Sequence, residues 1–105
     1  MRCEFVSDGT VLTLMLEGEL DHHSVGEVRE KTDVMLKCGV YHKLIMDLRG
    51  LTFMDSSGIS LVMGRVKLLA PLNGRVEIIS DKPRITKILK LADIDKYAVI
   101  REAKK

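Results

Sequence analysis

The sequence predicts an α/β domain with a mixed β-sheet packed with helices, in the order β-β-α-β-α-β-α-β. Two apolar runs at residues 3–6 and 11–16 flank an Asp-Gly pair, which is the strongest short-range signal of a hairpin because both turn residues tolerate positive φ. Helical segments then alternate with short apolar runs. Strands that are connected through helices pair in parallel, so the sheet should contain both antiparallel and parallel neighbours.

The first half of the chain is expected to hold the hairpin, a loop and the first helix. The strand at 11–16 is apolar at odd and even positions alike, which predicts burial on both faces. Residues 18–23 follow as a loop. Ser24 and Glu27 have the spacing of a capping box, so a helix should begin there and end before Gly39.

The second half repeats the alternation of strand and helix. Residues 43–48 are an apolar run of strand length, and 49–54 are expected to form a loop that returns two large apolar residues to the core. The next helix should begin near Ser57 and stop at Pro71. The remaining elements are predicted from the same signals and are a strand at 75–79, a helix opened by Asp81 and Pro83, and a strand at 97–100.

Length and composition limit the classes of protein that fit. The 105 residues correspond to one domain, expected over residues 1–100 with a polar tail at 101–105. The formal net charge of +2 does not favour direct nucleic-acid or anionic-membrane binding. No signal peptide is recognisable after Met1, and no apolar stretch has the length of a membrane span. Cys3 and Cys38 form no CxxC pair, so we expect reduced thiols and a cytoplasmic protein.

The segment Asp55-Ser56-Ser57-Gly58 is the candidate site. It precedes a helix, where free backbone amides and the positive end of the helix dipole favour an anion. Aspartate and serine are the commonest N-cap residues, so capping is the ordinary role for this segment. The alternative is that a serine carries a phosphate. Both roles are compatible if Ser57 caps the helix and Ser56 faces solvent.

Catalytic and metal-binding interpretations have weaker support. The segment lacks the first glycine of a G-x-S-x-G nucleophile elbow. A triad of Ser56, His23 and Asp21 is conceivable, but nothing in the spacing supports it. His22 and His23 are adjacent and therefore point in different directions, and no cysteine or spaced histidine completes a metal site. We expect a protein that is not an enzyme and that holds neither a cofactor nor a metal.

The second helix carries two stripes at helical spacing. The core stripe is predicted to consist of Ile59, Val62, Met63, Val66 and Leu69. A second, narrower stripe of small and apolar residues, bordered by Arg65 and Lys67, is Ser57, Leu61, Gly64 and Leu68. We expect this second stripe to be exposed and to form a docking face beside the anion site. The alternative is a helix that is buried on two sides.

Three runs of residues carry a family resemblance: Leu16–Ser24, which contains Glu-Leu-Asp-His-His, Leu51–Ile59, which contains the candidate segment, and the pair Gly64-Arg65. The chain resembles the STAS-domain anti-sigma factor antagonists over residues 1–100, and the Asp-His-His run is similar to the sporulation subfamily of endospore-forming bacteria. Family members usually carry a final helix after the last strand, for which too few residues remain here, so the packing over that strand is expected to differ.

The resemblance implies a phosphorylation switch. The unphosphorylated antagonist binds an anti-sigma factor that is also a serine kinase and thereby frees the sporulation sigma factor. The kinase uses ATP to modify the serine after the motif aspartate, here Ser56, and a serine phosphatase resets the switch. The switch and partner-binding residues would be Asp21, His22, His23, Asp55, Ser57, Gly58, Leu61, Gly64, Arg65 and Leu68. The alternatives are a generic STAS signalling module with another partner and, behind it, a small serine hydrolase.

Overall fold

The computed structural model describes residues 1–103 and contains one five-stranded sheet in the order β1-β2-β3-β4-β5. The strands are β1 (Arg2–Asp8), β2 (Val11–Leu20), β3 (Lys43–Met54), β4 (Arg75–Ser80) and β5 (Val99–Glu102). The helices are α1 (Val25–Cys38), α2 (Ser56–Leu69) and α3 (Pro83–Leu91), with short 3-10 turns η1 (Ala70–Leu72) and η2 (Ile94–Lys96). This order confirms the predicted fold class.

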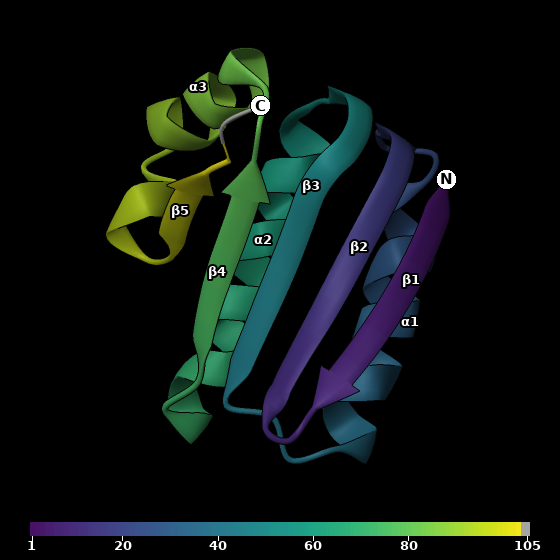
Figure 1. Cartoon of the computed structure of the whole chain (residues 1–105), viewed down its shortest axis with the longest axis vertical. Helices are drawn as coiled ribbons and strands as arrows, with labels where there is room; N and C mark the ends of the chain where they lie inside the picture. Colours follow the sequence, from purple (N-terminus) through teal and green to yellow (C-terminus); the bar gives the residue numbers. More distant parts are fainter. Residues whose placement is uncertain (104–105) are drawn as a thin grey trace.

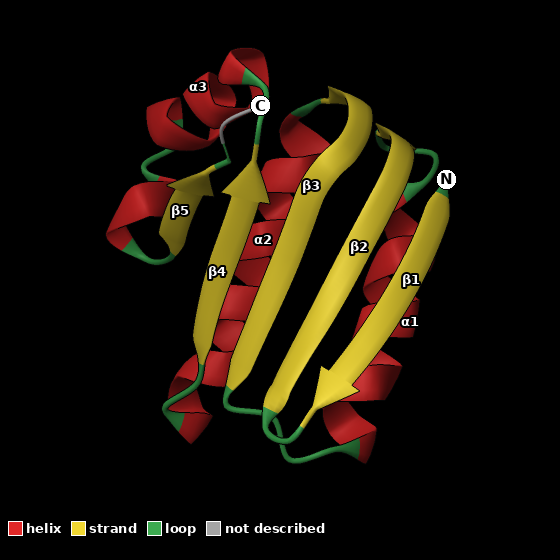
Figure 2. Cartoon of the chain, viewed as in Figure 1, coloured by secondary structure: helices red, strands yellow, loops and turns green. Residues whose placement is uncertain are grey.

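The sheet is mixed, as predicted, because β1 is antiparallel to β2 while β2, β3, β4 and β5 are parallel. Figure 1 shows α1 and α2 on the far face of the sheet, with α3 beside the end of β4. Figure 2 shows that no helix formed by residues 1–103 covers the near face of β1, β2 and β3. Leu12, Leu14 and Leu16 point into the core, whereas the residues that alternate with them at 11, 13 and 15 are half-buried. The expectation that this strand is fully buried on both faces is therefore wrong.

β2 and β3 are longer than predicted: the loop expected at 49–54 is wholly strand, and the loop expected at 18–23 is strand at 18–20 and a turn only at 21–23. The parallel ladder continues to the pair Leu20–Met54 through two register shifts. One shift lies beside Gly50, where a Cβ atom would come within 2.5 Å of the Leu16 carbonyl oxygen. Glycine permits this close approach, and the strand continues where a loop was expected.

The last elements also differ at their ends. Lys82, and not Asp81, occupies the N-cap position of α3, with Pro83 as the first helical residue. β5 extends to Glu102, so the first two residues of the predicted tail belong to the sheet. Lys104 and Lys105 lie outside the described residues. Within residues 1–103 no helix combines the length and apolar composition of a membrane span.

Candidate functional site

The N-terminus of α2 exposes Ser56. Asp55 is the N-cap, and its carboxylate accepts a hydrogen bond from the Ser57 amide at 2.8 Å. The segment therefore caps the helix as expected, but through Asp55 and not through Ser57. Ser56 is the first helical residue and is exposed, while Ser57 is half-buried. Because first-turn amides lack partners within the helix, this end attracts an anion placed on Ser56.

Gly58 ties this turn to the core. It is buried, and a Cβ atom there would overlap the Met54 side chain and lie 3.2 Å from Leu20. Leu20 and Met54 are the last paired residues of β2 and β3. The first turn of α2 therefore packs directly on the strand ends, and this packing sets the position of the Ser56 backbone.

Asp21 organises the turn that follows β2. Its carboxylate accepts hydrogen bonds from the amides of His23 at 2.9 Å and Ser24 at 3.0 Å. The Ser24 amide, followed by that of His23, lowers the pKa of Asp21 below its ordinary value. The predicted capping box is absent, because the Ser24 hydroxyl donates to the Glu19 carbonyl at 2.8 Å and does not cap α1.

The strand register brings the two segments to one end of the sheet. Asp21 follows Leu20 and Asp55 follows Met54, and the Asp55 amide donates to the Leu20 carbonyl at 3.3 Å. Figure 1 shows the ends of β2 and β3 side by side at this edge. Asp21 and Asp55 therefore follow neighbouring strand ends at the edge of the sheet where the exposed Ser56 begins α2.

His22 and His23 are exposed in the same turn, with ring centroids 3.9 Å apart, so the expectation that their side chains point in different directions is wrong. Among residues 1–103 no hydrogen bond joins Ser56 to either imidazole, and the Asp21 carboxylate bonds to backbone amides. The pattern of a serine–histidine–aspartate triad is not formed by these residues. No group of three or more potential metal ligands occurs among residues 1–103 either.

Only part of the predicted docking stripe on α2 is accessible in the structure. Leu61 is 1% exposed and Arg65 is 6% exposed, so the expectation that they face outward is wrong. The physical reason is that α2 packs against both the sheet and α1, which buries a wider arc of the helix than one stripe. Gly64 and Leu68 remain accessible, and the exposed line of the helix is completed by Ser56, Ser60 and Lys67.

Arg65 belongs to the interface between the two helices. Its Nε lies 3.1 Å from Asp33 Oδ1 on α1, but the N–H is not aligned for a hydrogen bond. Burial lowers the pKa of the Arg65 guanidinium, and the nearby Asp33 opposes that effect. The sequence pattern of α1 contains no signal for this pairing.

Phe53 is a surface residue that the sequence analysis missed. The segment 49–54 was expected to return its apolar residues to the core, but Phe53 is 46% exposed. Phe53 lies two residues before Asp55 and pairs with Glu19 of β2. Strand alternation could have placed it opposite the buried Met54, had the strand been predicted to continue.

Comparison with known proteins gives the family. The model of the STAS domain matches residues 3–104. The chain belongs to the STAS-domain family. This confirms the resemblance that was identified from residues 16–24 and 51–59.

Relatives of this STAS domain include two proteins named anti-sigma F factor antagonist. The one from Lysinibacillus sphaericus is 37% identical over 91 residues, which are 87% of this chain and 77% of that protein. The one from Paenibacillus polymyxa is 33% identical over 90 residues, with 86% and 77% covered.

Two solved structures share the fold over nearly the whole chain. The anti-sigma factor antagonist SpoIIAA in its unphosphorylated form has a TM-score of 0.85 and 28% identity, covering 99% of this STAS domain and 90% of that chain. The Bacillus cell fate determinant SpoIIAA in its phosphorylated form has a TM-score of 0.78 and 28% identity, covering 99% and 93%.

Proposed function

We propose that this STAS domain is an anti-sigma factor antagonist that is switched by phosphorylation of Ser56. In its unphosphorylated form it binds an anti-sigma factor that is also a serine kinase, and so frees a sporulation sigma factor in the cytoplasm. The observation that carries the proposal is the exposed hydroxyl of Ser56 at the first position of α2, directly after the cap Asp55. The names of the two relatives and of SpoIIAA support the partner class.

The charge of a phosphate explains why the modified form would be released. Phosphoserine adds about −1.5 to −2 charge units at neutral pH. The α2 N-terminus tolerates that charge, whereas Asp55 and Asp21 make the edge more acidic still. Against an acidic or apolar partner surface the added charge costs about 2–4 kcal/mol, a loss of affinity of roughly 30- to 1,000-fold. Release therefore needs no refolding.

The structural relatives support a switch that keeps the fold. SpoIIAA is similar to this chain in both its unphosphorylated and phosphorylated forms, with TM-scores of 0.85 and 0.78. A local change of charge, with the same domain architecture before and after phosphorylation, is the simplest mechanism that agrees with this likeness.

The partner surface is centred on the exposed face of α2. It contains the acceptor Ser56 and continues along Ser60, Gly64 and Leu68, while the turn at 21–24 flanks its N-terminal end. His22, His23 and Phe53 are exposed in the flanking segments. Leu61 and Arg65 are buried and support this surface indirectly, because they hold α2 against the sheet and against α1.

Phosphorylation is tested with the domain, ATP and the anti-sigma factor kinase of the same organism. Mass spectrometry of peptides from residues 54–65 should locate a single phosphate on Ser56. Ser56→Ala should abolish labelling and still bind the kinase, and a serine phosphatase should remove the label from the wild type. Ser57→Ala and Ser60→Ala are matched controls on the same helix and should still be labelled. Phosphate found on Ser57 or Ser60 would contradict the assignment.

A further inference from the structure

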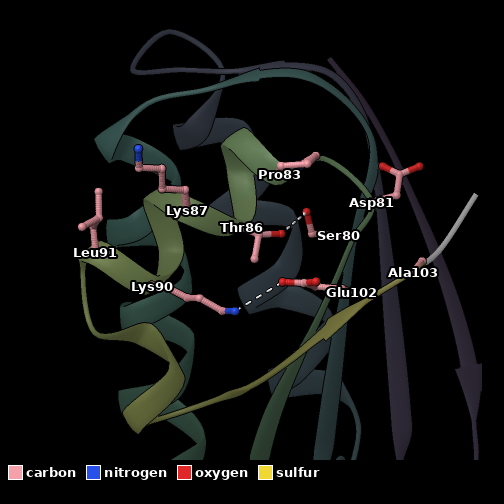
Figure 3. Close-up of a pocket in the computed structure, with 9 residues that line it drawn as sticks. All are labelled: Ser80, Asp81, Pro83, Thr86, Lys87, Lys90, Leu91, Glu102 and Ala103. Carbon is pink, nitrogen blue, oxygen red and sulfur yellow. Dashed lines mark hydrogen bonds and ion pairs between the residues drawn. The ribbon is translucent and has the colours of Figure 1, made fainter.

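A second site lies between α3 and the end of β5. A cavity of about 510 Å³ opens there, bounded by residues of α3, by Ser80 and Asp81 after β4, and by Glu102 and Ala103 (Figure 3). It shares no lining residue with the segments 21–24 and 55–58. The volume falls within the range of pockets that hold small molecules, about 300–1,000 Å³.

The floor of the cavity carries two buried hydroxyl groups. Thr86 is 6% exposed and Ser80 is 1% exposed. Thr86 Oγ1 donates to Ser80 Oγ at 3.1 Å, as Figure 3 shows. The buried Thr32 of α1 behaves differently, because its hydroxyl donates to its own helix at the Val28 carbonyl, 2.7 Å away. Thr86 is turned away from its helix carbonyls and toward the cavity floor.

The Thr86 oxygen retains accepting capacity. A hydroxyl that donates its proton still has two lone pairs, and within residues 1–103 no donor bonds to Thr86 Oγ1. The Thr86 hydroxyl already has one hydrogen-bond partner in Ser80, so a further donor would bond to a lone pair that is not in use. A ligand that offers a hydroxyl group would satisfy it.

Two carboxylate groups and two ammonium groups line the cavity, so the lining has no excess of positive charge. Asp81 pairs with Lys82 at 3.1 Å and Glu102 pairs with Lys90 at 3.3 Å. Lys87 also lines the cavity and forms no ion pair with residues 1–103. It is exposed at the mouth and extends outward in Figure 3, so its flexible chain can turn toward a bound anion. The remaining lining includes Pro83 and the 75%-exposed Leu91, which offer apolar surface.

We propose that this cavity binds a small organic anion with three features: one anionic group held by Lys87, an apolar body against Pro83 and Leu91, and a hydroxyl group that donates to Thr86 Oγ1. The anionic group is a carboxylate or a phosphate, which present the same chemistry to a lysine. The site is independent of the proposed phosphorylation of Ser56.

Four probes separate these features: 4-hydroxybenzoate, benzoate, phenol and 4-hydroxyphenyl phosphate. In amide NMR titrations, 4-hydroxybenzoate should shift residues 80–91 and 102–103 in a saturable manner. It should bind about tenfold more tightly than phenol, which lacks the anion, and several-fold more tightly than benzoate, which lacks the hydroxyl. The relative affinities of the two hydroxylated anions identify carboxylate or phosphate as the preferred group.

Two variants test the assigned contacts. Thr86→Val should reduce 4-hydroxybenzoate affinity to that of benzoate while leaving benzoate binding unchanged, a pattern that a merely structural threonine would not produce. Lys87→Met should weaken both carboxylates about tenfold, whereas Lys67→Met on α2 should weaken neither. The proposal is overturned if no probe shifts the cavity residues, if phenol binds as well as 4-hydroxybenzoate, or if folded Thr86→Val loses both carboxylates equally.

Discussion

Gly58 and Gly64 lie on the same helix, yet the fold requires only the first. A Cβ atom at Gly58 would overlap Met54, whereas a Cβ atom at Gly64 would meet nothing within 4 Å. Glycine inside a helix costs about 1 kcal/mol relative to alanine, so Gly64 lowers helix stability with no packing reason inside the domain. The contrast shows that the first turn of α2 is shaped by the core, while the middle of the helix is left clear on its outer side.

Charge placed on the inner side of α2 should break the fold. Leu61→Lys is expected to destabilise the domain by more than about 3 kcal/mol, because it replaces a fully buried leucine by an unpaired ammonium group. Leu68→Lys, on the exposed side of the same helix, should stay within about 0.5 kcal/mol of the wild type. Urea unfolding measures both, and equal destabilisation of the two variants would contradict the burial described here.

A bulky residue on the outer side should separate binding from stability. Gly64→Trp is expected to weaken anti-sigma factor binding by about 2 kcal/mol or more, as for a central interface contact. The melting temperature should change little, since the space beside Gly64 is open. Calorimetric titration measures the affinity, and wild-type affinity in a folded Gly64→Trp protein would remove α2 from the partner surface.

Adding one methyl group at each glycine sharpens the contrast. Gly58→Ala should destabilise the domain by about 1 kcal/mol, because the clash with Met54 outweighs the gain in helix propensity. Gly64→Ala should stabilise it by about 0.5–1 kcal/mol. Thermal and urea unfolding report the signs. The same sign at both positions would show that the first turn and the middle of the helix are not under different constraints.

The smallest expected effect is the pH dependence that Asp21 contributes. Its pKa is lowered from the ordinary 3.8 by the amides of Ser24 and His23. A depressed pKa in the folded state stabilises the protein above 3.8, and that contribution is lost as the pH falls through the lower folded value. Asp21→Asn should therefore be less stable than the wild type at neutral pH, and the difference should shrink near pH 3. Urea unfolding at both pH values tests the sign.

Periodicity predicted the kinds and order of the elements, but it could not locate every boundary. The segments 18–23 and 49–54 contain glycine and charged residues, which are typical of loops, yet residues 18–20 belong to β2 and residues 49–54 belong to β3. The bulge at Gly50 depends on the Leu16 carbonyl of a neighbouring strand. A contact between strands that are distant in the sequence has no local signal.

The candidate site was also predictable only in part from the sequence. The acidic and hydroxyl residues at 55–57 predicted a helix start with an exposed serine, although Asp55 and not Ser57 is the cap. The prediction of an exposed stripe on α2 is wrong at Leu61 and Arg65. A spacing pattern identifies one buried side of a helix, whereas α2 is buried against both the sheet and α1. A charged residue such as Arg65 also suggests exposure until its partner Asp33 is known.

At the N-terminus of α2 the residue that caps the helix is directly followed by the proposed phosphate acceptor. The Asp55 carboxylate holds the first turn through the Ser57 amide, whereas the exposed Ser56 side chain is not used by the cap. A substitution at Ser56 would therefore alter the proposed phosphate acceptor without removing the cap of the helix. Substitution at Asp55 would remove the cap and change the charge beside the acceptor together. The proposed acceptor position is thus evolvable in a way that its neighbour is not.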